Sequence, residues 1–562
     1  MRGAGVGTLY CLVRAWLGKG ADMAANLDIV IAGGGAAGWL TACYLQRALG
    51  ARAVDQTGKG DAPTITVIES PDIGIIGVGE GTFPTIRTTL TTLGIDEARF
   101  LRESNATFKQ GIRFDDWAQS PRAAAHSHYF HPFEFPQRVD GMELLPFWLL
   151  GDAGEGVDFA AAVTIQKRVA DASLAPKRAH EDGYRGPLNY AYHFDAFRFA
   201  NLLATVAKER GVRHVSDTID AVQLDESGAI AGLVTRAHGV VKGALYIDCT
   251  GLRAKLIGEA LGQPFRSCRN SLFTDRAVTC QVPYDGPASP IASYTIATGH
   301  EAGWTWDIGL NNRRGVGYVY SSAHSDDERA EKVLRAHLGA AAADKPVRLL
   351  KFEAGYRERQ WIQNCVAVGL SAGFFEPLES TGLMLIEVAA AMIAEFFPWN
   401  TDFAAPARLF NDRMVKRFGK IVNFLKMHYC LSERTEPFWH DNRSPAGIPD
   451  ELQCLLSAWR HRPPSHFDFV ADHETFPYFS YQYVLYGMGF RTNLDAARSR
   501  YTESAAASAQ QAFKQLRHIG QQAVADLPTH RALIERIYRD GFAERPRAPT
   551  PAASPGVARH RQ

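Results

Sequence analysis

Apolar and polar positions along the chain follow two alternating patterns, one typical of buried strands and one typical of amphipathic helices. Residues 27–32 are a short apolar run and residues 39–49 carry apolar side chains at helical spacing, so we predict a buried strand followed by a helix. Residues 65–68 and 244–249 predict two further buried strands. Strands and helices mixed in this way indicate an α/β fold.

The turn between the first strand and the first helix has the spacing of a dinucleotide-binding motif. Residues 33–38 read Gly-Gly-Gly-Ala-Ala-Gly, which is G-x-G-x-x-G, and such glycines let the backbone approach a pyrophosphate at the start of a helix. The second strand ends on an acidic residue placed to bind an adenosine ribose, although residues 52–63 lengthen the loop before it. We therefore favour a dinucleotide site over a structural turn. Its expected contacts are Gly33, Gly35, Ala36, Ala37, Gly38 and Glu69.

The predicted strand at residues 244–249 indicates which dinucleotide binds. It closes on Thr250-Gly251, as does the segment that returns to the sheet beside the cofactor in FAD enzymes with two long insertions. A second G-x-G-x-x-G in strand-turn-helix order, which a nicotinamide cofactor would need, is missing from the sequence. We therefore expect FAD as cofactor and a separate reductase as the source of electrons.

Residues 371–382 place two carboxylates and two hydroxyl groups in an otherwise apolar run. The run lies between a predicted strand at 364–369 and a predicted helix at 383–397, and such a junction can offer unpaired backbone N–H groups to an anion. Taken alone, the junction is equally well explained by Ser380 or Thr381 capping the helix and Glu379 being a solvated turn residue.

Composition excludes several classes of protein. The 562 residues are 46% apolar and 22% charged, as in an ordinary globular protein. With 61 basic and 60 acidic residues the net charge is +1, so neither nucleic acid nor a membrane surface is an expected partner. The eight cysteines form no C-x-x-C pair, which argues against a zinc site and a disulfide framework and favours a cytoplasmic location. No metal is expected.

Five motifs in order resemble those of flavin-dependent halogenases of the tryptophan halogenase family, over residues from about 28 to about 489. They are the glycine turn at 33–38, Gly-Val-Gly-Glu-Gly-Thr at 77–82, Asn-Ala-Thr-Phe-Lys at 105–109, Trp-Thr-Trp-Asp-Ile at 304–308 and Glu-Pro-Leu-Glu-Ser-Thr-Gly at 376–382. The resemblance implies a Rossmann-like FAD-binding box, FADH2 and O2, chloride or bromide as halide, and a separate NAD(P)H flavin reductase. It also implies a possible homodimer.

The resemblance implies a role for each matching residue. Lys109, which in isolation could be a surface lysine, would bind hypohalous acid or form a haloamine. Glu379 would polarise the halogenating species or take the proton that the substrate ring loses. Backbone N–H groups of Thr381 and Gly382 would bind halide. Flavin contacts are expected from a loop called the flavin strap, from the adenine half of the site and from the isoalloxazine edge: Gly79, Glu80, Ile219, Leu370 and Leu383.

Trp304 and Trp306 lie one residue apart on a predicted strand, so both side chains point to one face and could be plain core. The resemblance implies a structural role for them that keeps the substrate away from the flavin. Gly309 stands where the family has proline. The motif is therefore imperfect, although its tryptophans are present.

The substrate site is expected to be aromatic. His131 and Phe133 match the family's pair that sandwiches an indole ring, and Phe476 matches a second sandwiching position, although an aromatic loop packed on the core would give the same pattern. The tyrosine pair with which tryptophan-specific members hold the amino-acid group is missing from residues 460–476. We therefore expect indole or a larger indole-containing compound as the acceptor.

We expect an FAD-binding box over residues 23–400, with inserted substrate-site segments at about 111–189 and 266–339. A mostly helical substrate-binding region should follow over 401–542, where residues 408–429 predict a helix that we interpret as ordinary core. Residues 1–22 are expected to be an N-terminal extension, and 543–562 a disordered tail. Two other functions remain open: a flavin-dependent aromatic monooxygenase, and a flavin-binding protein without turnover.

Overall fold

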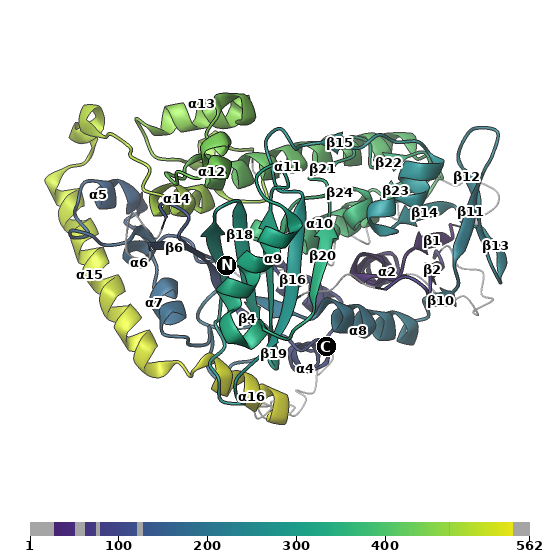
Figure 1. The fold of residues 1–562 in the computed structure, drawn as a ribbon, viewed down its shortest axis with the longest axis horizontal. Coiled ribbons are helices and arrows are strands. Elements are labelled where there is room, and N and C mark those ends of the chain that lie inside the picture. Colours follow the sequence, from purple (N-terminus) through teal and green to yellow (C-terminus); the bar gives the residue numbers. More distant parts are fainter. Residues whose placement is uncertain (1–26, 51–61, 75–78, 121–126, 471–472, 543–562) are drawn as a thin grey trace, which may run out of the picture.

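The computed structural model describes residues 27–50, 62–74, 79–120, 127–470 and 473–542. The expected N-terminal extension and C-terminal tail lie outside these residues, as do positions 52–61 of the lengthened loop and Gly77 and Val78 of the second motif. Two large sheets lie side by side, and helices surround them (Figure 1). The mixed α/β class expected from the pattern of apolar positions is confirmed.

The first sheet has six strands in the order β10-β2-β1-β14-β23-β22. Its pairings are parallel except for the last, and its central strands are fully buried, as expected for a sheet covered on both faces. The strands are β1 (Ile29–Ala32), β2 (Ile65–Glu69), β10 (Arg213–Ser216), β14 (Leu245–Asp248), β22 (Trp361–Ile362) and β23 (Cys365–Ala367). Helix α2 (Ala36–Leu49) packs beside this sheet and contacts both α8 (Ala196–Glu209) and α10 (Thr381–Glu395).

The second sheet has seven strands in the order β20-β16-β19-β18-β17-β5-β6, antiparallel except where β17 pairs with β5. Its strands are β5 (Gly111–Asp115), β6 (His128–Pro132), β16 (Arg276–Pro283), β17 (Thr295–His300), β18 (Gly303–Gly309), β19 (Arg313–Tyr320) and β20 (Val347–Lys351). A small sheet is formed by β3 (Glu80–Gly81), β9 (Ala191–Phe194) and β4 (Thr107–Lys109). Because β3 and β4 flank β9, the small sheet brings the strap and Lys109 to one place.

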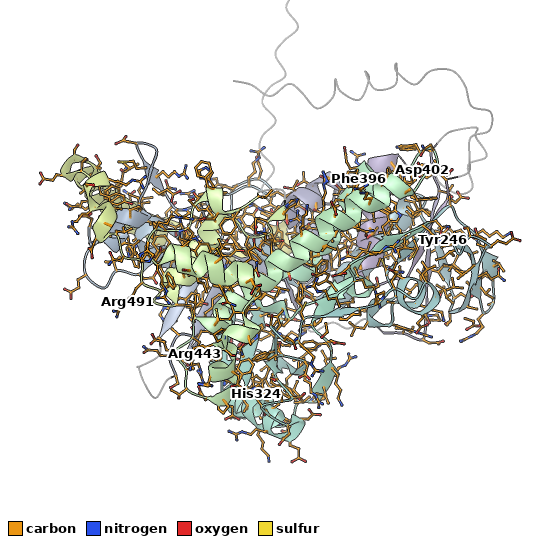
Figure 2. All side chains as sticks on the ribbon, turned by 90° about the horizontal axis from the view of Figure 1, so that it is seen from above. Tyr246, His324, Phe396, Asp402, Arg443 and Arg491 are labelled. Atoms are coloured by element: carbon orange, nitrogen blue, oxygen red, sulfur yellow. The ribbon has the colours of Figure 1, made fainter. Side chains whose placement is uncertain are left out.

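The described residues after 400 are mostly helical. Their helices are α11 (Ala404–Cys430), α12 (Pro437–Asn442), α13 (Asp450–Trp459), α14 (Tyr478–Gly487), α15 (Glu503–Asp526) and α16 (His530–Asp540). Figure 2 shows α11 as a long helix that crosses the molecule with its first turn beside Asp402. Helix α11 contacts β22, α10 and α14, so it links the first sheet to the C-terminal helices. None of the described helices has the length and apolarity needed to cross a membrane.

Shorter elements complete the described chain. The helices are α3 (Thr85–Thr92), α4 (Glu97–Glu103), α5 (Leu145–Leu149), α6 (Phe159–Val163), α7 (Gln166–Asp171) and α9 (Asp327–Leu338). The strands are β7 (Arg138–Val139), β8 (Met142–Glu143), β11 (Ile219–Leu224), β12 (Ile230–Thr235), β13 (Gly239–Val241), β15 (Arg266–Ser267), β21 (Gly355–Tyr356) and β24 (Gly373–Phe374).

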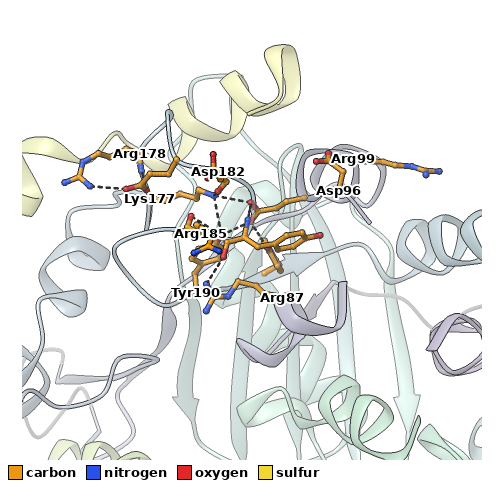
Figure 3. A network of polar contacts seen from close by, with 12 residues as sticks. Arg87, Asp96, Arg99, Lys177, Arg178, Asp182, Arg185 and Tyr190 are labelled. Atoms are coloured by element: carbon orange, nitrogen blue, oxygen red, sulfur yellow. Dashed lines mark hydrogen bonds and ion pairs between the residues drawn. The ribbon is translucent and has the colours of Figure 1, made fainter. Parts of the chain in front are cut away.

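A buried polar network contacts strand β9 of the small sheet (Figure 3). The carboxylate of Glu97, at the start of α4, accepts hydrogen bonds from Lys177 Nζ at 3.1 Å, Tyr190 OH at 2.9 Å and Tyr192 OH at 2.5 Å. Lys177 also donates to the carbonyl oxygen of Asp182 at 2.7 Å. Since Tyr192 lies on β9, which pairs with β4, the network anchors the strand beside Lys109.

Candidate active site

A cavity of about 560 Å³ opens where the carboxyl ends of β1 and β2 face the start of α10. This is the edge of a parallel sheet at which ligands usually bind. Twelve of the thirteen residues expected to contact flavin or halide line this one cavity: Gly33, Gly35, Ala36, Ala37, Glu69, Gly79, Glu80, Ile219, Leu370, Thr381, Gly382 and Leu383. The thirteenth, Gly38, packs behind the turn, where a Cβ would lie 1.9 Å from the carbonyl oxygen of Gly33.

The glycine turn packs so closely on the segments beside it that side chains at Gly33 and Gly34 would clash with them, whereas the space beside Gly35 is open. Gly33 has φ of +109°, and a Cβ there would lie 2.2 Å from the carbonyl oxygen of Cys249. A Cβ on Gly34 would lie 2.2 Å from the carboxyl carbon of Glu69. Helix α2 begins at Ala36, three residues before the predicted start, because Gly35 takes the N-cap position with extended backbone. Unpaired N–H groups of the first turn therefore face the cavity.

Lys109 is buried at the end of β4, with 1% of its surface exposed. Its Nζ donates a hydrogen bond to Ser380 Oγ at 2.9 Å and lies 5.4 Å from the centre of the Phe133 ring. Gly81 packs against this pair: a Cβ on Gly81 would lie 2.7 Å from Ser380 Oγ and 3.2 Å from Lys109 Nζ. Burial lowers the pKa of Lys109 to about 7, against the opposing effect of the charge on Glu379. A substantial fraction of this amine is therefore neutral near pH 7.

The start of α10 is built differently from an ordinary helix cap. Ser380 occupies the N-cap position with φ of +58°, and within the described chain its side chain makes no capping hydrogen bond. Its hydroxyl group instead accepts the hydrogen bond from Lys109. Thr381 and Gly382, the first two residues of the helix, line the cavity, and the first turn of a helix favours an anion.

Glu379 is buried, with 2% of its surface exposed, so its interpretation as a solvated turn residue is wrong. His131 Nδ1 lies 3.0 Å and His428 Nε2 also 3.0 Å from Glu379 Oε1. Burial alone would raise the pKa of Glu379, but the two histidines outweigh it and lower the pKa to about 2. Glu379 is thus held as a carboxylate, as a hydrogen-bond acceptor or base requires.

Two of the residues expected to contact the substrate, Phe133 and Phe476, belong to a group of packed aromatic side chains, the aromatic cluster. Phe133 lies 6.4 Å and Phe476 5.4 Å from the ring of Phe83, between centroids. Phe476 also stacks on Phe424 at 3.8 Å. His131 points its Nδ1 at Glu379, so it serves that carboxylate; its contact with a substrate stays a prediction.

A model of the family described as tryptophan halogenase matches residues 28–502. The chain belongs to the tryptophan halogenase family. It is a flavin-dependent halogenase, and the expectation drawn from its motifs is confirmed.

Named relatives of this halogenase share most of its length. It is 37% identical to the tryptophan 6-halogenase SttH of Streptomyces toxytricini over 484 residues, which cover 82% of this chain and 89% of that one. It is 36% identical to the 7-chloro-L-tryptophan 6-halogenase KtzR of a Kutzneria species, over 91% of this chain and 99% of that one. The crystal structure of a tryptophan halogenase from Shewanella frigidimarina superposes with a TM-score of 0.86 at 41% identity, covering 92% and 98% of the two chains.

The tryptophans of the family motif lie buried on β18, with ring centroids 6.2 Å apart. Trp306 lines the cofactor cavity, whereas Trp304 packs against Trp117 at 6.1 Å. A Cβ on Gly317 of the neighbouring strand would lie 2.3 Å from the Trp306 ring. Trp306 is therefore part of the cavity lining and Trp304 part of the core behind it, and the role of the pair stays a prediction.

Sequence reasoning missed two site residues of this halogenase, both on α11. We interpreted this helix as ordinary core, and that is wrong at its C-terminal end, where His428 contacts Glu379. Its neighbour Tyr429 donates a hydrogen bond to Glu376 Oε1 at 2.5 Å, and burial raises the pKa of Glu376 to about 8. A histidine on the buried face of a helix was the one signal available, because such a side chain needs a polar partner.

Proposed function

We propose that this halogenase transfers oxidised chloride or bromide to an electron-rich aromatic compound through a halogen species bound to Lys109. The observation that supports the proposal is the buried amine of Lys109, which contacts Ser380 of the cofactor cavity and lies over the Phe133 ring of the aromatic cluster, with the charge of Glu379 nearby. We propose indole or an indole-containing compound as acceptor, FAD as the flavin, and a separate NAD(P)H flavin reductase. We also propose that the protein is a homodimer.

Reduced FAD, when bound, supplies together with O2 the oxidising equivalents that turn halide into hypohalous acid. The cavity contains the groups to hold FAD: the turn at 33–38 for the pyrophosphate and Glu69 for the ribose. Thr381 and Gly382 would hold halide at the start of α10 by their backbone N–H groups.

Lys109 can hold the oxidised halogen in two ways. As an ammonium group it would donate a hydrogen bond to hypohalous acid. As a neutral amine its lone pair would attack the halogen, so that an N–halogen bond forms, the oxygen–halogen bond breaks and water leaves. The pKa of about 7 makes both forms available near neutral pH.

Halogen transfer would then take place beside the aromatic cluster. The electron pair of a ring carbon attacks the halogen, and the bond from halogen to nitrogen or oxygen breaks with its electron pair staying on that atom. Hypohalous acid leaves as hydroxide, which takes a proton from the Lys109 ammonium and becomes water, whereas the nitrogen of a haloamine takes a proton from water and becomes the amine again. The ring regains aromaticity when its C–H bond breaks and Glu379 takes the proton. Stacking on Phe133 and Phe476 would present a flat ring to Lys109.

The test uses the whole protein with a flavin reductase, NADH, FAD, O2 and bromide or chloride. Indole and L-tryptophan are compared as acceptors, because the named relatives are tryptophan halogenases. We expect haloindole by mass spectrometry, and an indole rate above the tryptophan rate. Lys109→Ala should oxidise reduced flavin at an unchanged rate and lower halogenation by at least about 10²-fold.

Three results would contradict the proposal. A hydroxylated product would show a monooxygenase, and reoxidation of reduced flavin at its rate in free solution would show a flavin-binding protein without turnover. Full halogenation by Lys109→Ala would refute the lysine-bound halogen. Ser480→Ala, a buried hydroxyl on α14, is the matched control and should leave the Lys109-dependent step intact.

A further inference from the structure

The hydrogen bonds of His428 limit where protons can lie at Glu379. His428 Nδ1 is 2.9 Å from the carbonyl oxygen of Phe424, which can only accept, so Nδ1 carries a hydrogen atom. His428 Nε2 is 3.0 Å from Glu379 Oε1, and this contact needs a proton on one of its two atoms. Either His428 is an imidazolium beside a carboxylate, or it is neutral beside a carboxylic acid. In both cases one proton lies between the two side chains.

This proton is well isolated. His428 is fully buried, and its ring packs between those of Phe114 at 5.1 Å, Trp117 at 6.1 Å and Phe424 at 5.1 Å. Within the described chain, the Phe424 carbonyl and Glu379 are the hydrogen-bond partners of His428. The proton therefore stays with the pair.

Other titratable groups lie near Glu379 on strands β6 and β4 and on helix α14. His131 and Tyr129 come from β6, and Lys109 comes from β4. His131 Nδ1 is 3.0 Å from Oε1 and 3.1 Å from Oε2, so it can donate to either oxygen. Tyr483 of α14 lies behind His131 at 6.1 Å between rings. His428 is the one member of this group that binds Glu379 from α11.

We propose that His428 is a positioning residue that keeps a proton beside Glu379, so that Glu379 meets the substrate as a carboxylate. The inference rests on the proposed function, because it assigns the proton from the ring carbon to Glu379. When that C–H bond breaks, its electron pair returns to the ring and the proton goes to the carboxylate, while the first proton stays on His428 Nε2. Without a positive charge on His428, His131 alone would oppose the effect of burial, so the pKa of Glu379 would rise and less of it would be a carboxylate at acid pH.

His428→Gln tests the charge separately from the hydrogen bond, because a glutamine amide can still donate to Glu379 but cannot become cationic. The control is His440→Gln, which replaces an exposed histidine on α12. Halogenation is measured from about pH 5 to about pH 9, relative to flavin oxidation, together with FAD content and melting temperature.

In the wild type and in His440→Gln, Lys109 should titrate in this range whereas Glu379 should stay ionised, so Lys109 should give at most a tenfold change per pH unit. In His428→Gln, protonation of Glu379 should add a second decrease in halogenation on the acid side of the pH profile. We expect activity within about threefold of the wild type near pH 8 and a loss of at least about tenfold relative to the wild type near pH 6. A ratio of variant to wild type that is the same at every pH would show a merely structural role and overturn the proposal.

A measurement on the wild type does not depend on the variant's folding. In ¹⁵N spectra of histidine-labelled protein, one buried histidine should show both ring nitrogens protonated, as the two contacts of a cationic His428 require. Absence of that signal would overturn the proposal. If the wild type forms no halogenated product, the proposed function fails, and the spectra still decide the proton on His428.

Discussion

Ser380→Ala should move the titration of Lys109 to lower pH. The variant removes the hydroxyl group that accepts from Lys109 Nζ at 2.9 Å and keeps the helix start, whose backbone an alanine tolerates as well as a serine does. A hydrogen bond from an ammonium group is about twice as strong as one from a neutral amine. The loss therefore destabilises the charged form more, by about 1 kcal/mol, which equals about 0.7 of a pKa unit.

The expected result follows from the pKa of about 7 in the wild type. In Ser380→Ala the midpoint should fall to a little above about pH 6. If the neutral amine carries the halogen, activity rises with pH, and the variant should exceed the wild type about fourfold near pH 6 when each is scaled to its own plateau. If the ammonium form carries it, activity falls with pH, and the midpoint still moves down.

The assay is the rate of halogenated product per flavin oxidised, over a pH series in buffers of equal ionic strength. Ser480→Ala, with a buried hydroxyl on α14, should keep the wild-type midpoint. A midpoint for Ser380→Ala that is unmoved or higher would refute the reasoning, since Ser380 then does not stabilise the charged amine.

Two predictions concern stability. Glu97→Gln leaves Lys177 buried without its carboxylate and should lower the free energy of unfolding, measured by urea titration, by about 3–5 kcal/mol. Arg99→Gln, which breaks a half-exposed ion pair, should change the free energy of unfolding by less than about 1 kcal/mol. Equal effects of the two variants would contradict the importance given to the buried network. Gly38→Ala places a Cβ 1.9 Å from the Gly33 carbonyl oxygen and should cost about 1–3 kcal/mol and reduce FAD retention. Its control, Gly419→Ala within α11, has no described atom within 4 Å of the new Cβ and should raise the melting temperature slightly.

Local patterns in the sequence predict the cofactor half of the molecule well. The strand β1, the glycine turn and α2 follow one another in 21 residues, and each has its own signal in apolar period or glycine content. The motif at 376–382 was ambiguous alone because a helix cap and an anion site use the same residue types. Family motifs removed that ambiguity.

The contacts around Glu379 could not be predicted from sequence. Its partners His131 and His428 are 248 and 49 residues away, so only the packing of β6 and α11 brings them together. Ser380 is a similar case, because its backbone at φ of +58° turns the hydroxyl group from the helix toward Lys109. The sequence predicted that Phe133 and Phe476 contact the substrate, but it did not predict that Phe476 stacks on Phe424.

In the proposed mechanism, Gly81 affects how much hypohalous acid escapes on its way from the cofactor cavity to Lys109. Gly81 lines the cofactor cavity and at the same time touches the Lys109–Ser380 pair, so little more than peptide backbone separates the two compartments. A small oxidant formed on one side would reach the amine before it met bulk solvent. A side chain at this position would lengthen that path and give the oxidant time to escape. In the proposed mechanism, the lack of a side chain at position 81 would therefore limit the escape of free hypohalous acid.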